Sequence, residues 1–241
     1  MDGNVKKEIS PEGYNAKTKD GWGITYEYDC CQYKVKETTA EGSVRRYVYD
    51  GNGNILKVIQ SEEYALHGEE GTGIAYEYNC RNQLTSVVDE EGNVVRHFVY
   101  DEAGRLVKEM DAYGYAYGET DEERYGTLYR YNLAGWLVEK REPVQSSDNG
   151  EMLYCVTGYE YDLNGNRVLE KRSSQYLTKT QLLTGSLLIS MEYDARNRLV
   201  KVSDNLGAAM EYTYDSLNNR TSEKARINEN KYRLVFYDYD P

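Results

Sequence analysis

The chain has 241 residues, of which 41 are acidic and 29 are basic, so its formal net charge is −12. This acidic balance, without a cluster of Lys and Arg, argues against nucleic-acid binding and against attachment to an anionic membrane. Ile, Leu, Val and Phe make up only roughly 19% of the residues, a level typical of disordered chains. However, 26 Tyr residues supply rings that bury large apolar areas, so we expect the chain to fold. No apolar run reaches the length of a transmembrane helix, and the start lacks the pattern of a signal peptide.

One motif, Tyr-x-Tyr-Asp, returns along the whole chain. Before its first copy, Met1 to Val5 resemble the tail of a turn whose Tyr-Asp lies upstream. The second Tyr of the motif then falls at Tyr28, Tyr49, Tyr78, Tyr100, Tyr131, Tyr161, Tyr193, Tyr214 and Tyr239. A period of this size indicates a repeat architecture. Because the last copy stops at Asp240-Pro241, both ends are interpreted as cutting through repeats.

The residues after each second Tyr predict the tip of a β-hairpin. The next position is Asp or Asn in all eight complete units, and the fourth position is Gly or Asn in every unit except the first, which has Gln32. Asp and Asn suit the start of a type I turn, while Gly and Asn tolerate the left-handed conformation. We therefore expect a positive φ at Gly104 and Gly165.

The flanks of this turn predict two strands. The Tyr-x-Tyr spacing places two rings on one face of the first strand, and Phe98 and Met191 replace the first Tyr in two units. An apolar residue usually follows six positions after the second Tyr, although Arg167 and Arg220 stand there in two units. The second strand alternates poorly, and the sequence leaves open which of its faces is buried.

A second turn closes each short unit, and the long units carry insertions at this place. The second turns are Thr39–Gly42, Asp89–Gly92 and Asp204–Gly207, and the insertions lie around 60–75, 110–128, 141–157 and 171–190. Their Gly, Ser, Glu and Thr content favours exposed loops or extended hairpins. The 171–190 insertion, with Leu182, Leu183, Leu187 and Leu188, could alternatively hold a short helix.

These elements predict an all-β fold. Residues 1–241 form a single repeat array of about eight complete units, each an antiparallel hairpin, and we expect 16 to 18 short strands in one long curved sheet. Strand edges exposed at the two ends should promote self-association.

Chemical sites find little support in the sequence, and the expected catalytic, cofactor-binding and metal-binding residues are none. His67 and His97 lie far apart, and Cys30, Cys31, Cys80 and Cys155 lack the two close pairs of a zinc site. The turns that begin at Asp50 and Asp162 resemble the first half of a calcium loop but lack its Gly and Glu. A Tyr-lined face could stack on sugar rings, although rings at strand spacing more often form packing layers.

The pattern Tyr-x-Tyr-Asp-x-x-Gly-Asn/Arg-Leu resembles the YD repeat of the rearrangement-hotspot (RHS) proteins of bacteria, which is related to the YD shell of animal teneurins. It is clearest from Phe98 to Leu106 and from Tyr159 to Asn166. The resemblance implies a β-sheet that spirals into a hollow shell. In bacterial members such a shell encloses a C-terminal toxin, while in teneurins it supports cell–cell contact. The self-cleaving plug of the bacterial shell has no counterpart in this sequence.

The resemblance leads us to expect a non-catalytic shell segment, extracellular or on a bacterial cell surface. Its partners would be flanking repeats and a C-terminal toxin or effector domain, with no nucleic acid and no membrane insertion. The alternative is a cell-surface or cell-wall-associated adhesive surface for a carbohydrate or a protein. The 110–128 and 141–157 insertions are the expected place for such a ligand.

Overall fold

The computed structural model describes residues 3–18, 20–118, 120–146, 150–183, 185–228 and 230–240. These residues divide into two compact units, 1–124 and 125–241. Each unit is built from antiparallel strands, so the predicted all-β fold is confirmed. No helix among the described ranges is both long and apolar enough to cross a membrane.

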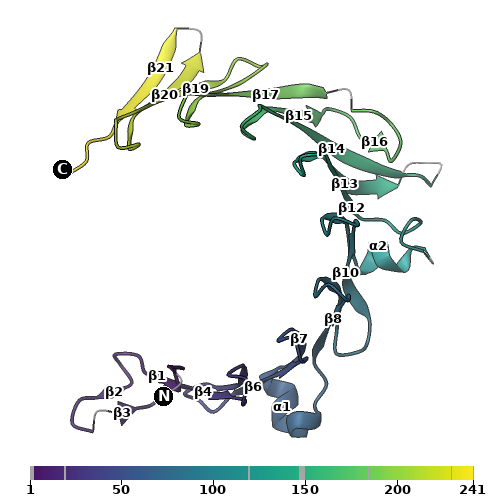
Figure 1. The fold of residues 1–241 in the computed structure, drawn as a ribbon, viewed down its shortest axis with the longest axis vertical. Helices are drawn as coiled ribbons and strands as arrows, with labels where there is room; N and C mark the ends of the chain where they lie inside the picture. The colour runs from purple at the N-terminus through teal and green to yellow at the C-terminus, as the bar shows by residue number, and fades with distance from the viewer. Residues whose placement is uncertain are drawn as a thin grey trace. The chain divides into compact units, whose positions relative to one another are not determined.

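The first unit holds one open antiparallel sheet and a separate small hairpin. The strands of the sheet, in spatial order, are β1 (Lys7–Glu8), β4 (Ile24–Tyr28), β5 (Lys34–Thr38), β6 (Val44–Tyr49), β7 (Ile55–Ile59), β8 (Ile74–Tyr78), β9 (Leu84–Val88), β10 (Val94–Tyr100) and β11 (Leu106–Asp111). The small hairpin pairs β2 (Tyr14–Asn15) with β3 (Asp20–Gly21). From β4 onward, neighbours in the sheet are therefore neighbours in sequence (Figure 1).

The second unit follows the same plan. Its strands are β12 (Thr127–Tyr131), β13 (Leu137–Ser146), β14 (Met152–Tyr161), β15 (Arg167–Ser173), β16 (Leu177–Thr178), β17 (Gly185–Tyr193), β18 (Leu199–Asp204), β19 (Ala209–Tyr214), β20 (Arg220–Asn228) and β21 (Lys231–Phe236). The short β16 pairs with the start of β14, while β17 pairs with β15. Across the described residues 21 strands are present, more than the 16 to 18 predicted, and the two-residue strands β1, β2, β3 and β16 account for the excess, since 21 − 4 = 17.

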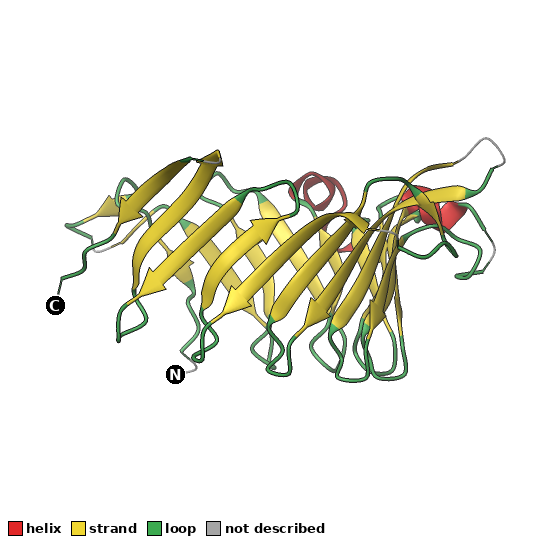
Figure 2. Cartoon of the chain, turned by 90° about the horizontal axis from the view of Figure 1, so that it is seen from above, coloured by secondary structure: helices red, strands yellow, loops and turns green. Residues whose placement is uncertain are grey.

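The predicted hairpin turn is confirmed in each of the eight complete sequence repeats. The fourth residue after the second Tyr has a positive φ in all eight, including 82° at Gly104, 86° at Gly165 and 68° at Gln32. In each hairpin the strand register shifts just before the second Tyr, as a bulge requires. The Gly of the predicted second turns, at Gly42, Gly92 and Gly207, also has a positive φ. Figure 2 shows the turns of each unit following one another along an edge of the sheet.

Two insertions are helical, which the sequence interpretation as loops or hairpins did not anticipate. The 60–75 insertion contains α1 (Ser61–His67) and the 3₁₀ turn η1 (Gly68–Glu70), and the 110–128 insertion contains α2 (Ala112–Ala116). The carboxylate of Asp111 caps α2 by accepting a hydrogen bond from the backbone N–H of Gly114 (2.8 Å). The 141–157 insertion is the expected extended hairpin, formed by β13 and β14.

The alternative of a helix at 171–190 is wrong for the residues described there. Leu187 and Leu188 belong to β17 and lie opposite Arg172 and Lys171 of β15. Pairing with a neighbouring strand therefore overrides the local helical tendency of the Leu residues.

In the first unit both helical insertions cover the face of the sheet opposite the paired Tyr rings. Lys36 lies over the ring of Tyr64 of α1, and the ring of Tyr115 of α2 lies against His97. Figure 1 shows α1 and α2 on the same side of this sheet. The deepest burial occurs beneath the insertions: Ile59 and Met110 have no exposed surface. The second strand of a hairpin can bury side chains on both faces: in β7, Val58, which lies opposite Tyr47, is 8% exposed and its neighbour Ile59 is 0% exposed.

In the second unit the buried cluster lies under the 171–190 segment. Its members are Met152, Tyr154, Val156 and Leu177, with Tyr125, Leu128 and Leu183 packed against them. Outside this cluster most strand residues are half-buried.

We expect Gly135→Ala to destabilise the second unit by about 1–2 kcal/mol, because its φ of 84° disfavours a Cβ while no atom lies within 4 Å of the added carbon. Gly165→Ala should cost more, since its Cβ would also lie 3.1 Å from Trp136 Cζ2. Urea unfolding of both variants tests this order. Gly51→Ala, with open space and no positive φ, is the control, and an equal loss in all three would contradict the turn assignment.

Candidate functional site

In eight of the nine motifs, the second Tyr hydroxyl donates to a backbone carbonyl of the preceding segment, at distances of 2.7 to 3.1 Å. In the seven of these that follow an earlier motif, the carbonyl lies six residues after the previous second Tyr. The pairs are Tyr28–Val5, Tyr49–Lys34, Tyr78–Ile55, Tyr100–Leu84, Tyr161–Leu137, Tyr193–Arg167, Tyr214–Leu199 and Tyr239–Arg220. We call this series the Tyr ladder. It explains why Phe and Met replace the first Tyr of the motif but never the second.

The first ring of the motif carries a different contact. Where the sixth residue after the second Tyr is basic, its charge lies over the first ring of the same unit: Arg167 over Tyr159 (5.3 Å) and Arg220 over Tyr212 (4.4 Å). Lys34 lies over Tyr26 in the same way, at 5.2 Å. Cation–π contact thus accounts for the Arg residues that broke the expected apolar pattern.

We expect Tyr161→Phe to lower the free energy of unfolding of the second unit by about 1 kcal/mol, since it leaves the carbonyl of Leu137 without its 2.8 Å hydrogen bond. Tyr159→Phe in the same motif keeps its ring beneath Arg167 and should be nearly neutral. Chemical unfolding of the two variants side by side is the measurement. Equal destabilisation would mean that the hydroxyl has no special role.

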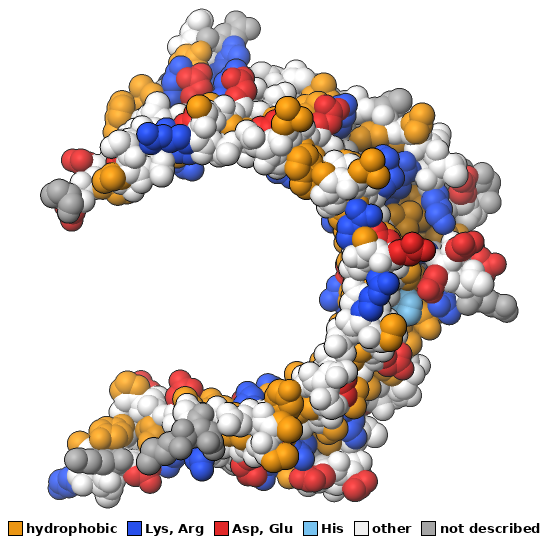
Figure 3. Space-filling model, viewed as in Figure 1, with side chains coloured by type: hydrophobic (Ala, Val, Ile, Leu, Met, Phe, Trp, Pro, Cys, Tyr) orange, Lys and Arg blue, Asp and Glu red, His pale blue; other side chains and the backbone are white. Residues whose placement is uncertain are grey.

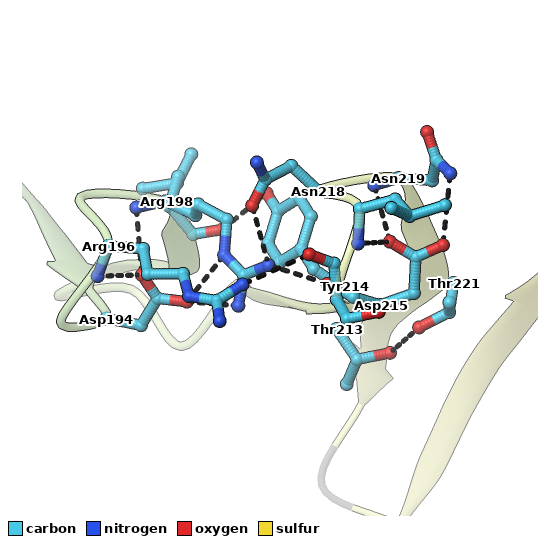
Figure 4. Close-up of polar contacts among 12 residues, drawn as sticks. Asp194, Arg196, Arg198, Thr213, Tyr214, Asp215, Asn218, Asn219 and Thr221 are labelled. Carbon is cyan, nitrogen blue, oxygen red and sulfur yellow. Dashed lines mark hydrogen bonds and ion pairs between the residues drawn. The ribbon is translucent and has the colours of Figure 1, made fainter.

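The hairpin turns also contact each other along the edge of the sheet. Figure 4 shows Asp194 Oδ1 accepting from the backbone N–H groups of Arg196 (2.8 Å) and Arg198 (3.0 Å). Arg198 then reaches the next turn, donating to the backbone carbonyl of Asp215 (2.9 Å) and to Asn218 Oδ1 (3.1 Å). Its guanidinium lies over the ring of Tyr214. The carboxylates that could have suggested a metal or an acid–base pair are therefore occupied by turn hydrogen bonds.

These hydrogen bonds favour the ionised carboxylates. The side chain of Asn54 and backbone N–H groups hold the pKa of Asp50 below its ordinary value, and Asn166 does the same for the pKa of Asp162. The backbone N–H of Arg198, with its side chain, lowers the pKa of Asp194. Both calcium-like turns thus use their Asp oxygens internally: Asn54 and Asn166 each donate to the second carboxylate oxygen at 2.8 and 2.9 Å.

A lowered folded pKa means that the stabilisation is complete above the unfolded pKa of about 3.9 and is lost as pH falls through the folded value. Asp162→Asn keeps the acceptor oxygen, as Asn132 does naturally, but it cannot be protonated in this range. We therefore expect this variant to lose less stability than the unsubstituted protein as the pH falls from about 4 to the folded pKa. Thermal unfolding of both proteins across pH 2–5 measures this difference. An unchanged pH profile would contradict it.

One unit brings a serine, a histidine and an aspartate together. Ser86 Oγ lies 3.1 Å from His97 Nδ1, and His97 Nε2 lies 3.5 Å from Asp121 Oδ1. Ser86 is only 4% exposed, however, so its hydroxyl is closed to a substrate, whereas a nucleophile must be within reach of the atom it attacks. The cluster instead connects β9 and β10 to the 110–128 insertion. The sequence had given no sign of this grouping, because strand pairing and an insertion bring the three residues together.

A basic side chain of the sheet donates hydrogen bonds to three of the four insertions. Lys57 donates to the carbonyl of Gly71 (3.1 Å), and the buried Lys108 donates to the carbonyls of Asp121 and Arg124. In the second unit Arg141 donates to the carbonyls of Thr178 and Gln181, both at 2.9 Å. These three residues fix loops rather than bind a ligand.

The remaining candidates stay apart. His67 contacts Glu63 on α1 (3.0 Å), far along the chain from the His97 cluster. Cys80 is exposed and Cys155 half-buried, while Cys30 and Cys31 are exposed neighbours. Within the described ranges, no group of three or more His, Cys, Asp or Glu residues could hold a metal ion.

Comparison with known families finds the RHS repeat in this chain. The model described as "RHS Repeat" matches residues 78–116 and 193–226. The resemblance stated from the motif is therefore confirmed at these two segments, each of which contains a complete hairpin turn. No curated protein matches the sequence.

Solved structures of TcdB2-TccC3 are similar to the chain. The crystal structure of TcdB2-TccC3-Cdc42 is 14% identical with a TM-score of 0.36, and the alignment covers 93% of this chain and 15% of that one. TcdB2-TccC3 without its hypervariable C-terminal region gives 14% identity, a TM-score of 0.36 and coverage of 89% and 14%. The chain thus spans about one seventh of the length of these structures.

Proposed function

We propose that this chain, which carries RHS repeats at 78–116 and 193–226, is a non-catalytic segment of a protein shell. The observation that supports this best is the Tyr ladder, because the same hydrogen bond between successive repeats recurs in both units and engages the second Tyr hydroxyl of the motif. A wall needs identical joints, whereas an enzyme needs one unit whose reactive groups stay accessible. In the cluster of Ser86, His97 and Asp121, the Ser86 side chain that would have to react is buried.

The shell would enclose or present a C-terminal toxin or effector domain of a longer bacterial protein, extracellular or at the cell surface. The sheet suits this role because its stability is spread over many similar joints. On the face seen in Figure 3, basic and acidic side chains are interspersed rather than gathered by sign, which favours neither nucleic acid nor an anionic membrane.

An adhesive surface is the second candidate, and α2 supports it. Tyr113 on this short helix and Tyr117, the residue that follows it, are 70% and 54% exposed. Exposed aromatic side chains on an insertion are typical of protein or carbohydrate contacts.

A substitution scan that measures stability and the activity of the full-length protein separates the two roles. Tyr113→Ser and Leu163→Ser, at exposed positions on α2 and on a turn tip, are compared with Tyr161→Phe in the Tyr ladder. A shell predicts that activity falls in proportion to lost stability and that neither surface change affects it. An activity loss confined to Tyr113→Ser, with stability intact, would overturn the shell in favour of adhesion.

A further inference from the structure

The first hairpin turn differs from the other seven in its chemistry. Two neighbouring thiols, Cys30 and Cys31, stand at its tip, and both are exposed. It is also the turn in which Gln32, rather than Gly or Asn, takes the positive φ, 68°. The two Sγ atoms are 4.0 Å apart.

Hydrogen bonds fix the backbone of the turn that carries the two thiols. Asp29 Oδ1 accepts from the backbone N–H groups of Cys31 and Tyr33, both at 2.9 Å, and the N–H of Gln32 donates to the carbonyl of Asp29 (3.1 Å). The ring of Tyr33 stacks on Tyr49 of the next unit, with centroids 5.1 Å apart. A ligand of the thiols would therefore bind to a preorganised pair, and it would lose less conformational entropy than with a flexible pair.

The separation of the sulfur atoms decides what such a pair can do. A disulfide would require them to approach to about 2.05 Å, and adjacent Cα atoms, about 3.8 Å apart, are closer than the roughly 4.4 Å at which unstrained disulfides begin. Two thiolates on one tetrahedral metal, each bound at about 2.3 Å, lie about 3.8 Å apart. A pyramidal trivalent centre, whose bond angles are smaller, needs the sulfur atoms somewhat closer than this. The observed 4.0 Å is far from a bond, and rotation of the two exposed side chains can bring the sulfur atoms to the chelating separation.

The number of available protein ligands excludes some of the ions that two thiols could bind. Structural zinc takes four protein ligands, but no group of three or more suitable residues occurs in the described parts of the chain. We propose that Cys30 and Cys31 form a dithiol site for a thiophilic centre that needs two protein sulfurs and keeps its own remaining ligand, as a trivalent organoarsenical does. With phenylarsine oxide, the As=O oxygen leaves as water with the two thiol protons, and two As–S bonds form without a change of oxidation state.

The chain contains its own matched control. Cys80 stands at the same turn position as Cys30, and its turn is fixed in the same way, with Asn79 Oδ1 accepting from the backbone N–H groups of Arg81 and Gln83. Its neighbour is Arg81 rather than a second thiol. Cys80 should therefore bind the arsenical only as a monothiol, which excess competing monothiol reverses.

The experiment is a titration of the reduced full chain with phenylarsine oxide in excess glutathione, followed by intact mass and by thermal unfolding. We expect one stable adduct, which a small dithiol removes, and at least a hundredfold weaker binding in Cys30→Ser and in Cys31→Ser. Arg81→Cys in the Cys30→Ser background should restore one adduct, at the hairpin turn that begins at Asn79.

Two results would overturn the proposal. One is a wild-type adduct that Cys30→Ser retains, which would place the site at other thiols. The other is rapid loss of two hydrogens from the Cys30–Cys31 pair by a mild disulfide oxidant, with no arsenical adduct, which would show that the pair closes rather than chelates. Unfolding curves of the unliganded Ser variants verify that the turn still forms.

Discussion

Tyr154→Ala should lower the free energy of unfolding of the second unit by about 3–5 kcal/mol, the cost of removing a large buried side chain. Tyr154 is 2% exposed and belongs to the cluster with Val156 and Leu177 beneath the 171–190 segment. Burial also raises the pKa of its hydroxyl. Most of the sheet is half-buried, so the loss of one of its few deep side chains should have an unusually large effect. Urea unfolding followed by tyrosine fluorescence and circular dichroism measures the loss.

The control for this substitution is Tyr176→Ala, at a ring that is 54% exposed in the same segment. It should change stability little. If both variants lost the same stability, the cluster could not be the main core of the second unit.

Arg141→Met should destabilise the second unit by up to about 3–5 kcal/mol, the cost of breaking a buried ion pair, although Glu139 keeps a more distant partner in Arg130, whose Nη2 lies 3.5 Å from Glu139 Oε2. The side chains of Arg141 and Glu139 are 9% and 12% exposed, and Nε lies 3.0 Å from Glu139 Oε1. The carbonyls of Thr178 and Gln181 would also lose their donor. Relative to the unsubstituted protein, the rate of amide hydrogen exchange should therefore increase more in residues 177–183 than in β18–β20.

Lys201→Met provides the comparison. Lys201 pairs with Glu192 at 2.6 Å, but the two side chains are 39% and 57% exposed, so solvent screens the pair and its loss should change stability far less. Uniform exchange throughout the second unit of Arg141→Met would mean that Arg141 supports the sheet as a whole rather than the segment above it.

The hairpins could be predicted from the sequence because their determinants are local. Asp101 and Gly104 form their turn through hydrogen bonds within five residues, so the motif alone predicted the positive φ. The Tyr ladder could not be predicted in full, since its acceptor is a backbone carbonyl and leaves no trace in the sequence. The constancy of the second Tyr beside the variable first one was a signal that its hydroxyl has a partner.

The two helical insertions could not be predicted, because their structure depends on distant contacts. The helix α2 follows the cap at Asp111 and packs over His97, and α1 packs over Lys36. Likewise, the proximity of Ser86, His97 and Asp121 depends on the pairing of β9 with β10 and on an insertion that folds back. The division into two compact units at Arg124 was not foreseen either, and the single array over 1–241 stays a prediction.

The acceptor of the Tyr ladder has a consequence for how such a chain can change over time. Each Tyr hydroxyl recognises a main-chain oxygen, and the side chains at that position include Val5, Lys34, Ile55 and Arg167. Every residue type supplies the same oxygen, so the donor of one repeat fits any other repeat as its neighbour. Recombination that deletes, duplicates or exchanges whole repeats would therefore leave each new junction with its hydrogen bond intact.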